Sequence, residues 1–166
     1  MQDARSHPIR KSPRLPRYDY AQAGAYLVTI SVDQMEHRFG NVSDGQMQLN
    51  QAGEMVNAAW RRLPDRFQSI ELDAFVVMPN HFHGILFLGV DPEIDPPSLS
   101  RVIQVFKSQT AVEYGRGIRE GALPPVRRAL WHRSFHDRII RDERILGLAR
   151  EYVADNPLNW HEAHAR

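Results

Sequence analysis

The sequence predicts an α+β fold, a ferredoxin-like split βαβ sandwich in which an antiparallel sheet carries helices on one face. The first observation behind this prediction is the order of patterns: strand-like alternation and helical spacing follow one another as strand, helix, strand, strand, helix, strand. A further helical stretch comes after the last strand. The second observation is a length of 166 residues without cysteine, which suits one domain stabilised by a hydrophobic core.

The first part of this pattern holds a strand, a hairpin and a helix. Apolar alternation predicts a strand over residues 25–32, and turn-forming glycines indicate a small hairpin over residues 39–49. Asn50 is a typical helix N-cap residue, and the helical spacing after it stops at Pro64. We therefore expect the first helix between these two residues.

The middle part predicts two more strands and a second helix. The strands are expected over residues 70–77 and 81–88, and the short connection between them can join only antiparallel neighbours. Ser98 or Ser100 can cap a helix that reaches about Tyr114.

The last part predicts a fourth strand over residues 130–140 and then a helix that Asp142 caps. We expect this helix to end at Pro157, because the residue before a proline avoids helical geometry. The helix carries Tyr152 among apolar residues at helical spacing.

Charge is unevenly distributed, although the net charge is only +1. Residues 1–17 carry five basic residues against one acidic, residues 18–97 four against eleven, and residues 98–166 twelve against eight, which gives +4, −7 and +4. Nineteen of the 21 basic residues are arginine, whose planar guanidinium matches phosphate groups. A nucleic-acid partner fits this pattern, and so does a solvated surface that reflects genome composition.

Composition also indicates the domain organisation and the compartment. Prolines and basic residues mark residues 1–17 as a flexible arm in front of a single domain over residues 18–166. No apolar run approaches the roughly 20 residues of a membrane span, and the N-terminus lacks a hydrophobic signal core. We expect a cytoplasmic protein without a membrane partner.

The most informative motif is His81-Phe82-His83, at the start of the third predicted strand. Alternate residues of a strand point to the same side, so the two imidazoles share one face. Two imidazoles on a rigid edge can bind a divalent cation and leave coordination positions open for a substrate oxygen. Two surface histidines beside a turn are the plain alternative.

Tyr152 and Asn156 are four residues apart on the last predicted helix, so they are neighbours on its surface. The phenol is a candidate nucleophile, and the amide oxygen is a candidate third ligand for the cation. A core tyrosine and an ordinary helix-terminal asparagine are the alternatives. Rival ligands near the last strand are His132, His136 and Asp137.

Taken together, these residues resemble the single-tyrosine HUH transposase family, most closely the REP-associated tyrosine transposases and related insertion-sequence transposases. The resemblance covers most of the chain from Arg17 onward. Its blocks, in order, are Arg17–Tyr20, Tyr26–Ile30, Phe39-Gly40, Phe75–Gly84, Phe106–Ser108, Phe135–Arg141 and Tyr152–Pro157.

The resemblance implies a specific chemistry. His81 and His83 would bind Mg²⁺ or Mn²⁺, and Asn156 would complete the metal site. Tyr152 would attack a phosphodiester of single-stranded DNA, forming a 5′-phosphotyrosine intermediate and a free 3′-OH, and a later transesterification would rejoin DNA. Hairpins beside the cut are the usual recognition element. This exchange conserves phosphodiester energy, so the absence of a Gly-rich phosphate loop is expected.

Basic and aromatic side chains are expected to contact the DNA backbone and to stack on unpaired bases. The candidates are Arg14, Arg17, Tyr18, Tyr20, Arg101, Phe106, Lys107, Arg133 and Arg138. Exposed arginines and half-buried aromatic residues are also common without any ligand.

Two questions stay open at this stage. The protein would act as a monomer or as a homodimer, with the tyrosine working in its own subunit or in the partner. The alternative functions are a non-catalytic protein, derived from a transposase, that binds DNA or RNA hairpins, and a purely structural ferredoxin-like domain.

Overall fold

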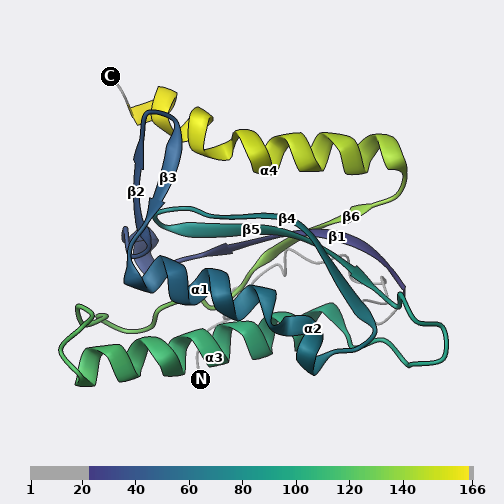
Figure 1. Cartoon of the computed structure of the whole chain (residues 1–166), viewed down its shortest axis with the longest axis horizontal. Coiled ribbons are helices and arrows are strands. Elements are labelled where there is room, and N and C mark those ends of the chain that lie inside the picture. Colours follow the sequence, from purple (N-terminus) through teal and green to yellow (C-terminus); the bar gives the residue numbers. More distant parts are fainter. Residues whose placement is uncertain (1–22, 165–166) are drawn as a thin grey trace, which may run out of the picture.

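The computed structural model describes residues 23–164, so the predicted basic arm lies outside the described residues. Four antiparallel strands form the central sheet in the order β4-β5-β1-β6 (Figure 1). The strands are β1 (Gly24–Ser31), β4 (Ile70–Val77), β5 (His81–Leu88) and β6 (His136–Ile140). This order, with β5 between β4 and β1, is the split βαβ arrangement that the sequence predicts.

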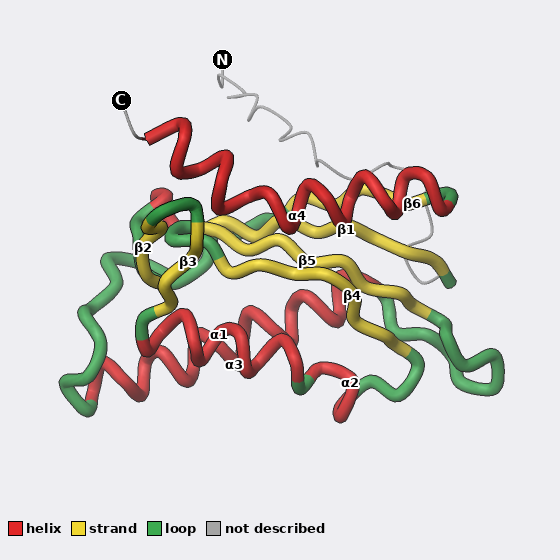
Figure 2. The backbone as a smooth tube through the Cα atoms, turned by 45° about the horizontal axis from the view of Figure 1, so that its top comes forward, coloured by secondary structure: helices red, strands yellow, loops and turns green. Residues whose placement is uncertain are grey.

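Helices cover the two faces of the sheet, as Figure 2 shows. On one face lie α1 (Gln51–Arg61), α2 (Leu63–Arg66) and α3 (Leu99–Arg119). On the opposite face lies α4 (Glu143–His164), which carries the candidate tyrosine. The predicted sandwich with an appended C-terminal helix is therefore confirmed.

A small hairpin stands at one end of the sheet, beside the C-terminal part of α4 (Figure 1). Its strands are β2 (Gly40–Ser43) and β3 (Gln46–Leu49), which pair with each other in a two-stranded sheet. A short 3-10 turn, η1 (Asp33–Met35), connects β1 to this hairpin.

Side chains alternate across the sheet and build two apolar layers. Val28 and Phe82 are completely buried in the larger layer, together with residues of α1 and α3. Leu27 and Ile85 face the other way and pack against α4. Because Ile85 and His83 point to the same side of β5, the smaller layer continues directly into the histidine pair.

The three long helices begin at the expected N-caps. The side-chain oxygens of Asn50, Ser98 and Asp142 each accept a backbone N–H three residues later, at 2.9, 3.2 and 2.8 Å. Each such cap stabilises a helix by about 1 kcal/mol. Of the two candidate serines, Ser98 is thus the cap of α3.

The prediction that the second helix ends near Tyr114 is wrong, because α3 continues to Arg119. Gly117 lies in this continuation, and a Cβ added there would lie only 2.6 Å from the side chain of Leu123. This glycine, which suggests a loop in the sequence, instead lets the following segment pack closely on the helix.

The prediction that the last helix ends at Pro157 is also wrong, because α4 continues to His164. The helix bends in its C-terminal part (Figures 1 and 2), as expected where a proline lacks its N–H and crowds the preceding turn. Contacts beyond the proline hold the last turns in place: Leu158 packs against Gly45 in the turn of the β2–β3 hairpin.

The fourth strand is shorter than the predicted range of residues 130–140, since β6 spans only His136–Ile140. The Nζ of Lys107 donates to the carbonyls of His132 and Arg133, at 2.7 and 3.1 Å. These carbonyls are therefore bound to a side chain rather than to a strand ladder. Upstream, Trp131 makes only an isolated bridge to Val32.

Over the described residues, no helix combines the length and the apolar character that crossing a membrane requires.

Candidate active site

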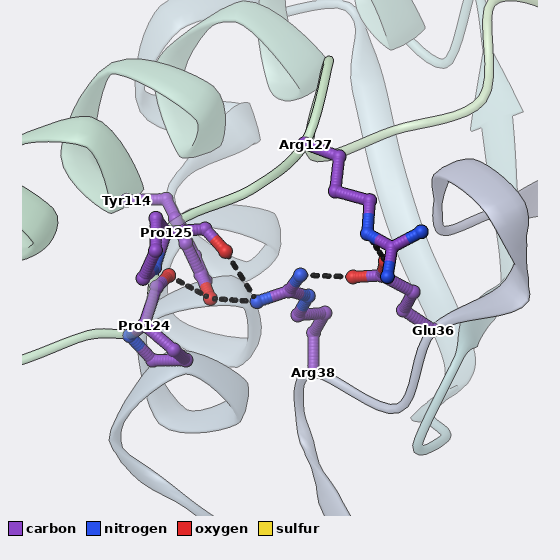
Figure 3. Close-up of polar contacts among 6 residues, drawn as sticks. All are labelled: Glu36, Arg38, Tyr114, Pro124, Pro125 and Arg127. Carbon is purple, nitrogen blue, oxygen red and sulfur yellow. Dashed lines mark hydrogen bonds and ion pairs between the residues drawn. The ribbon is translucent and has the colours of Figure 1, made fainter.

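The turn between β4 and β5 places the two histidines at the end of the sheet. Arg38 binds this turn. The backbone N–H of Arg38 donates to the carbonyl of Pro79 at 2.8 Å. Its guanidinium forms an ion pair with Glu36 and donates to Tyr114 Oη at 3.4 Å and to the Pro125 carbonyl at 3.0 Å (Figure 3). The turn is thus tied to the C-terminal half of α3.

His81 and His83 project from β5 toward α4, and their ring centroids lie 4.7 Å apart. In the neighbouring strand β1, Ser31 is opposite His81 and Thr29 is opposite His83. His83 is only 3% exposed, whereas His81 is partly exposed. The pair therefore lies where the apolar layer beneath α4 opens to solvent.

Asn80 and Asn156 contact the two nitrogens of the His81 ring. The Nδ2 of Asn80 donates to the carbonyl of Met35 at 3.3 Å, so its Oδ1 faces His81 Nδ1 at 2.7 Å. With the amide oriented in this way, Nδ1 of His81 donates to Asn80, and Nε2 of the neutral ring is left with its lone pair. This Nε2 points at Asn156 Oδ1, 3.3 Å away.

His81 Nε2 and Asn156 Oδ1 thus point at each other across a short gap. A cation between these two atoms would accept a lone pair from each. Imidazole nitrogen and amide oxygen are accepted ligands of divalent metals, and the oxygen suits Mg²⁺ or Mn²⁺. The residues present thus fit a small divalent cation.

His83 links this site to the candidate nucleophile. Its Nδ1 lies 2.8 Å from Thr29 Oγ1, and its Nε2 lies 3.4 Å from Tyr152 Oη. The Tyr152 ring meets the imidazole edge-on, and the residue is 47% exposed. Tyr152 is therefore not a core residue: its hydroxyl faces the histidines while its ring is open to solvent.

Burial lowers the pKa of both histidines. The pKa of His83 falls to about 3, first because of desolvation and then because of repulsion from a charged His81. Desolvation also lowers the pKa of His81, and the contact with Asn156 partly offsets this effect. Both rings are neutral at pH 7, which is the form that binds a metal.

An ion pair between α4 and β4 helps to set how the helix lies on the sheet. The Nε and Nη2 of Arg150 lie 2.9 and 2.6 Å from the two carboxylate oxygens of Asp73. The hydrogen bond from Arg150 lowers the pKa of Asp73. With Ala149 and Val153 buried against the sheet, Tyr152 is directed toward the histidines.

The rival ligands do not join this site. Between residues 23 and 164, no three His, Cys, Asp or Glu side chains gather into a group that could hold a metal. The His132 ring contacts Ser134, and Asp137 lies opposite Val28 in β1 rather than opposite Thr29, whose hydroxyl contacts His83. His136 lines a groove on the far side of Tyr152. Asn156 is the third donor that the geometry offers.

The candidate DNA contacts are scattered. Arg138 lines the groove beside Tyr152, and Arg133 is exposed in the loop before β6. Arg101 and Lys107 are on α3, on the face opposite the histidines, and the Lys107 ammonium binds loop carbonyls. Phe106 is completely buried in the core, so the prediction that it stacks on bases is wrong. Outside the described residues lie Arg14, Arg17, Tyr18 and Tyr20.

Trp160 is a neighbour of the site that sequence reasoning missed. Its ring centroid lies 5.9 Å from that of His81, and it stacks on His164 at 4.3 Å. The spacing of Tyr152, Asn156 and Trp160 by four residues is the signal that could have identified it. The prediction that the helix ends at Pro157 places Trp160 outside the helix, where this spacing has no meaning.

No family model matches the chain. An uncharacterized protein of Haemophilus influenzae is 33% identical over 163 residues, which cover 92% of this chain and 91% of that protein. A REP-associated tyrosine transposase, solved bound to a REP hairpin, superposes with a TM-score of 0.59 and 18% identity over 89% of this chain and 74% of that one.

A second solved structure, of a candidate transposase from Deinococcus radiodurans R1, superposes with a TM-score of 0.53 and 14% identity, over 84% of this chain and 94% of that one. At these identities the solved structures establish the fold, and the resemblance found in the sequence is confirmed at that level. The chain belongs to the same family as the Haemophilus influenzae protein and has the fold of the REP-associated tyrosine transposases.

Proposed function

We propose that this protein is a metal-dependent endonuclease and strand transferase for single-stranded DNA, which acts through a 5′-phosphotyrosine at Tyr152. The observation that carries the proposal is that two residues of α4 contact the two histidines within one chain. Tyr152 Oη lies 3.4 Å from His83 Nε2, and Asn156 Oδ1 lies 3.3 Å from His81 Nε2. The proposed nucleophile is thus adjacent to the three proposed metal ligands.

The chemistry is an in-line exchange at phosphorus. Tyr152 Oη attacks the scissile phosphorus, its proton leaves to water, and a P–O bond to the phenol forms. The P–O3′ bond breaks, and the 3′ oxygen takes a proton from water. In the reverse sense, a 3′-OH attacks the phosphotyrosine and releases Tyr152. No bond energy has to be supplied from outside.

His81, His83 and Asn156 would hold Mg²⁺ or Mn²⁺, which supplies charge neutralisation for the phosphate oxygens. Asn80 and Thr29 orient the two imidazoles by binding their Nδ1 atoms, as second ligand shells do in metal sites. DNA transposition or the processing of REP hairpins is the biological setting that we propose, because the first solved neighbour is bound to a REP hairpin.

A covalent adduct is the direct test. Incubation with a single-stranded hairpin oligonucleotide and Mn²⁺ should give a protein–DNA adduct that resists denaturation. Tyr152→Phe should abolish the adduct while hairpin binding survives. Tyr114→Phe is the matched control: its hydroxyl contacts Arg38 and the Pro124 carbonyl rather than the histidines, and Arg38 keeps its bond to the Pro125 carbonyl, so this variant should still form adduct. An adduct that persists in Tyr152→Phe would rule out this nucleophile.

The metal site is tested separately. His81→Ala and His83→Ala should each abolish Mn²⁺-dependent cleavage and weaken Mn²⁺ binding in calorimetry. His132→Ala removes an exposed loop histidine and should change neither measurement. Cleavage at wild-type rates in both site variants would exclude the metal site.

One observation favours the second candidate, a non-catalytic hairpin-binding protein derived from a transposase. The described residues offer no third His, Cys, Asp or Glu to the histidine pair, and a neutral amide is a weaker ligand than a carboxylate. Strong hairpin binding without any adduct in Mn²⁺ would favour this candidate.

A further inference from the structure

A groove of about 490 Å³ lies between α4 and the β1–β6 part of the sheet, on the side of Tyr152 away from Asn156. The strand register builds its floor, because Thr29 is opposite His136 and Leu27 is opposite Arg138. The residues that line it are Leu27, Thr29, His136, Asp137, Arg138, Ile140, Ile145, Leu148, Ala149 and Tyr152.

The groove combines an apolar interior with a cationic rim. Leu27, Ile140 and Ala149 form the buried apolar surface, and Leu148 is 52% exposed at the opening. Arg138 makes no ion pair with any residue in the described part of the chain, so its guanidinium is available at the rim. An apolar groove beside an available guanidinium suits a flat aromatic ring that is attached to a negatively charged backbone, as in a nucleotide.

Tyr152 lies between this groove and the candidate active site and contacts both. Its hydroxyl faces His83, while its ring lines the groove. A strand whose phosphodiester lies at the Tyr152 hydroxyl must continue on both sides of that phosphate. One of the two adjacent nucleotides is therefore next to the groove opening.

We propose that this groove binds the unpaired base of a nucleotide adjacent to the scissile phosphate, with Arg138 on its phosphate. The inference rests on the proposed function and adds a subsite to it. Continuity with Tyr152 and the cationic rim favour a nucleotide over an apolar peptide. A volume of about 490 Å³ is within the range of small-molecule sites and can hold one nucleotide.

The test measures binding without cleavage, in the Tyr152→Phe background, which keeps the ring wall of the groove. Hairpin oligonucleotides carry a single abasic nucleotide at successive positions of the unpaired strand. At one position next to the cut site, loss of the base should weaken binding roughly tenfold or more, the effect of losing one stacked base. Other positions of the unpaired strand serve as internal references.

The groove is then altered with Arg138→Ala and Leu148→Ala, two exposed side chains whose loss leaves the core intact. With both substitutions present, the intact hairpin should bind as weakly as the hairpin that lacks the critical base binds to the Tyr152→Phe protein. Removing that base should then cause no further loss of affinity. Arg144→Ala removes an exposed arginine of α4 that does not line the groove, and it should retain the full abasic effect.

Three results would overturn the inference. An abasic effect of equal size in the groove variant would place the base elsewhere. An absence of any abasic effect, with hairpin binding and adduct formation intact, would reject the subsite and leave the proposed function standing. A change in oligomeric state in the groove variant, with DNA binding unaltered, would assign the groove to a second copy of the chain. Failure of the unaltered protein to form any adduct would instead count against the proposed function.

Discussion

At the scale of single residues, Asn156 is where this site departs from a simple pair of histidines. Its amide oxygen lies 3.3 Å from His81 Nε2, where it can share a cation with the imidazole. The charge at this position should therefore tune metal affinity directly.

We predict that Asn156→Asp binds Mn²⁺ more tightly than the wild type and that Asn156→Ala binds it about tenfold or more weakly. A carboxylate adds charge to the ligand set, whereas alanine removes a donor. Titration calorimetry measures both. Asp155→Ala alters the exposed preceding side chain and should leave the affinity unchanged. Equal affinities for all four proteins would contradict the assignment of Asn156 as a ligand.

The lowered pKa of His83 predicts a pH dependence of stability. The unfolded chain binds a proton near pH 6.5 and the folded chain only near pH 3, so acid favours unfolding between these values. The metal-free protein should therefore lose stability as the pH falls through this window, by up to about 1.4 kcal/mol per pH unit from this residue. Above pH 6.5 the contribution is constant.

His83→Gln isolates this contribution, because glutamine does not titrate. Urea unfolding at pH 7 and pH 4.5 should show a smaller loss of stability in the variant than in the wild type. The same loss in both proteins would mean that His83 titrates normally in the folded state.

At the scale of elements, β5 needs a residue without a side chain directly after the histidines. A Cβ added at Gly84 would lie 2.7 Å from the Trp60 ring and 2.8 Å from the Phe82 ring, and both of these rings are completely buried. The position of the histidine pair therefore depends on aromatic packing on the other face of the sheet.

Gly84→Ala should lower the free energy of unfolding by about 1–3 kcal/mol, the usual cost of overpacking a core. Gly147→Ala is the matched control, because nothing lies within 4 Å of its added Cβ in α4. In a helix that change should be neutral or stabilising by about 0.5–1 kcal/mol. Urea midpoints compare the two, and equal midpoints would contradict the packing account.

The sequence alone predicts β5 and its histidines well, because a period of two and a flanking turn are local signals. It predicts α4 less well. Its continuation past Pro157 depends on the contact between Leu158 and Gly45, which are far apart in sequence. The extent of β6 depends on Lys107, whose bonds to loop carbonyls no local pattern reveals.

At the scale of the whole molecule, the two halves of the site come from β5 and from a helix some seventy residues later, joined across one face of the sheet. The sequence identifies these residues but does not predict that they lie together. Their proximity depends on how α4 lies on the sheet, and the ion pair between Arg150 and Asp73 that helps to set this is a long-range contact. In the folded chain, Tyr152 reaches His83 without a second subunit.

A site completed within one chain predicts that inactive variants cannot rescue one another. A mixture of Tyr152→Phe with the double variant His81→Ala and His83→Ala should form no adduct above the level of either alone. Gel analysis of hairpin cleavage in Mn²⁺ measures this, with each variant mixed with wild type as the control. Recovery of adduct in the mixture would mean that the tyrosine acts on the partner subunit.

The proposed phosphotyrosine is tested most directly by locating the DNA on the protein. After reaction with a hairpin oligonucleotide and Mn²⁺, nuclease and protease digestion followed by mass spectrometry should find a nucleotide 5′-phosphate on the peptide that contains Tyr152. The fragment spectrum should place it on the phenol oxygen. A nucleotide attached to any other residue, or cleaved DNA with no modified peptide, would contradict the account.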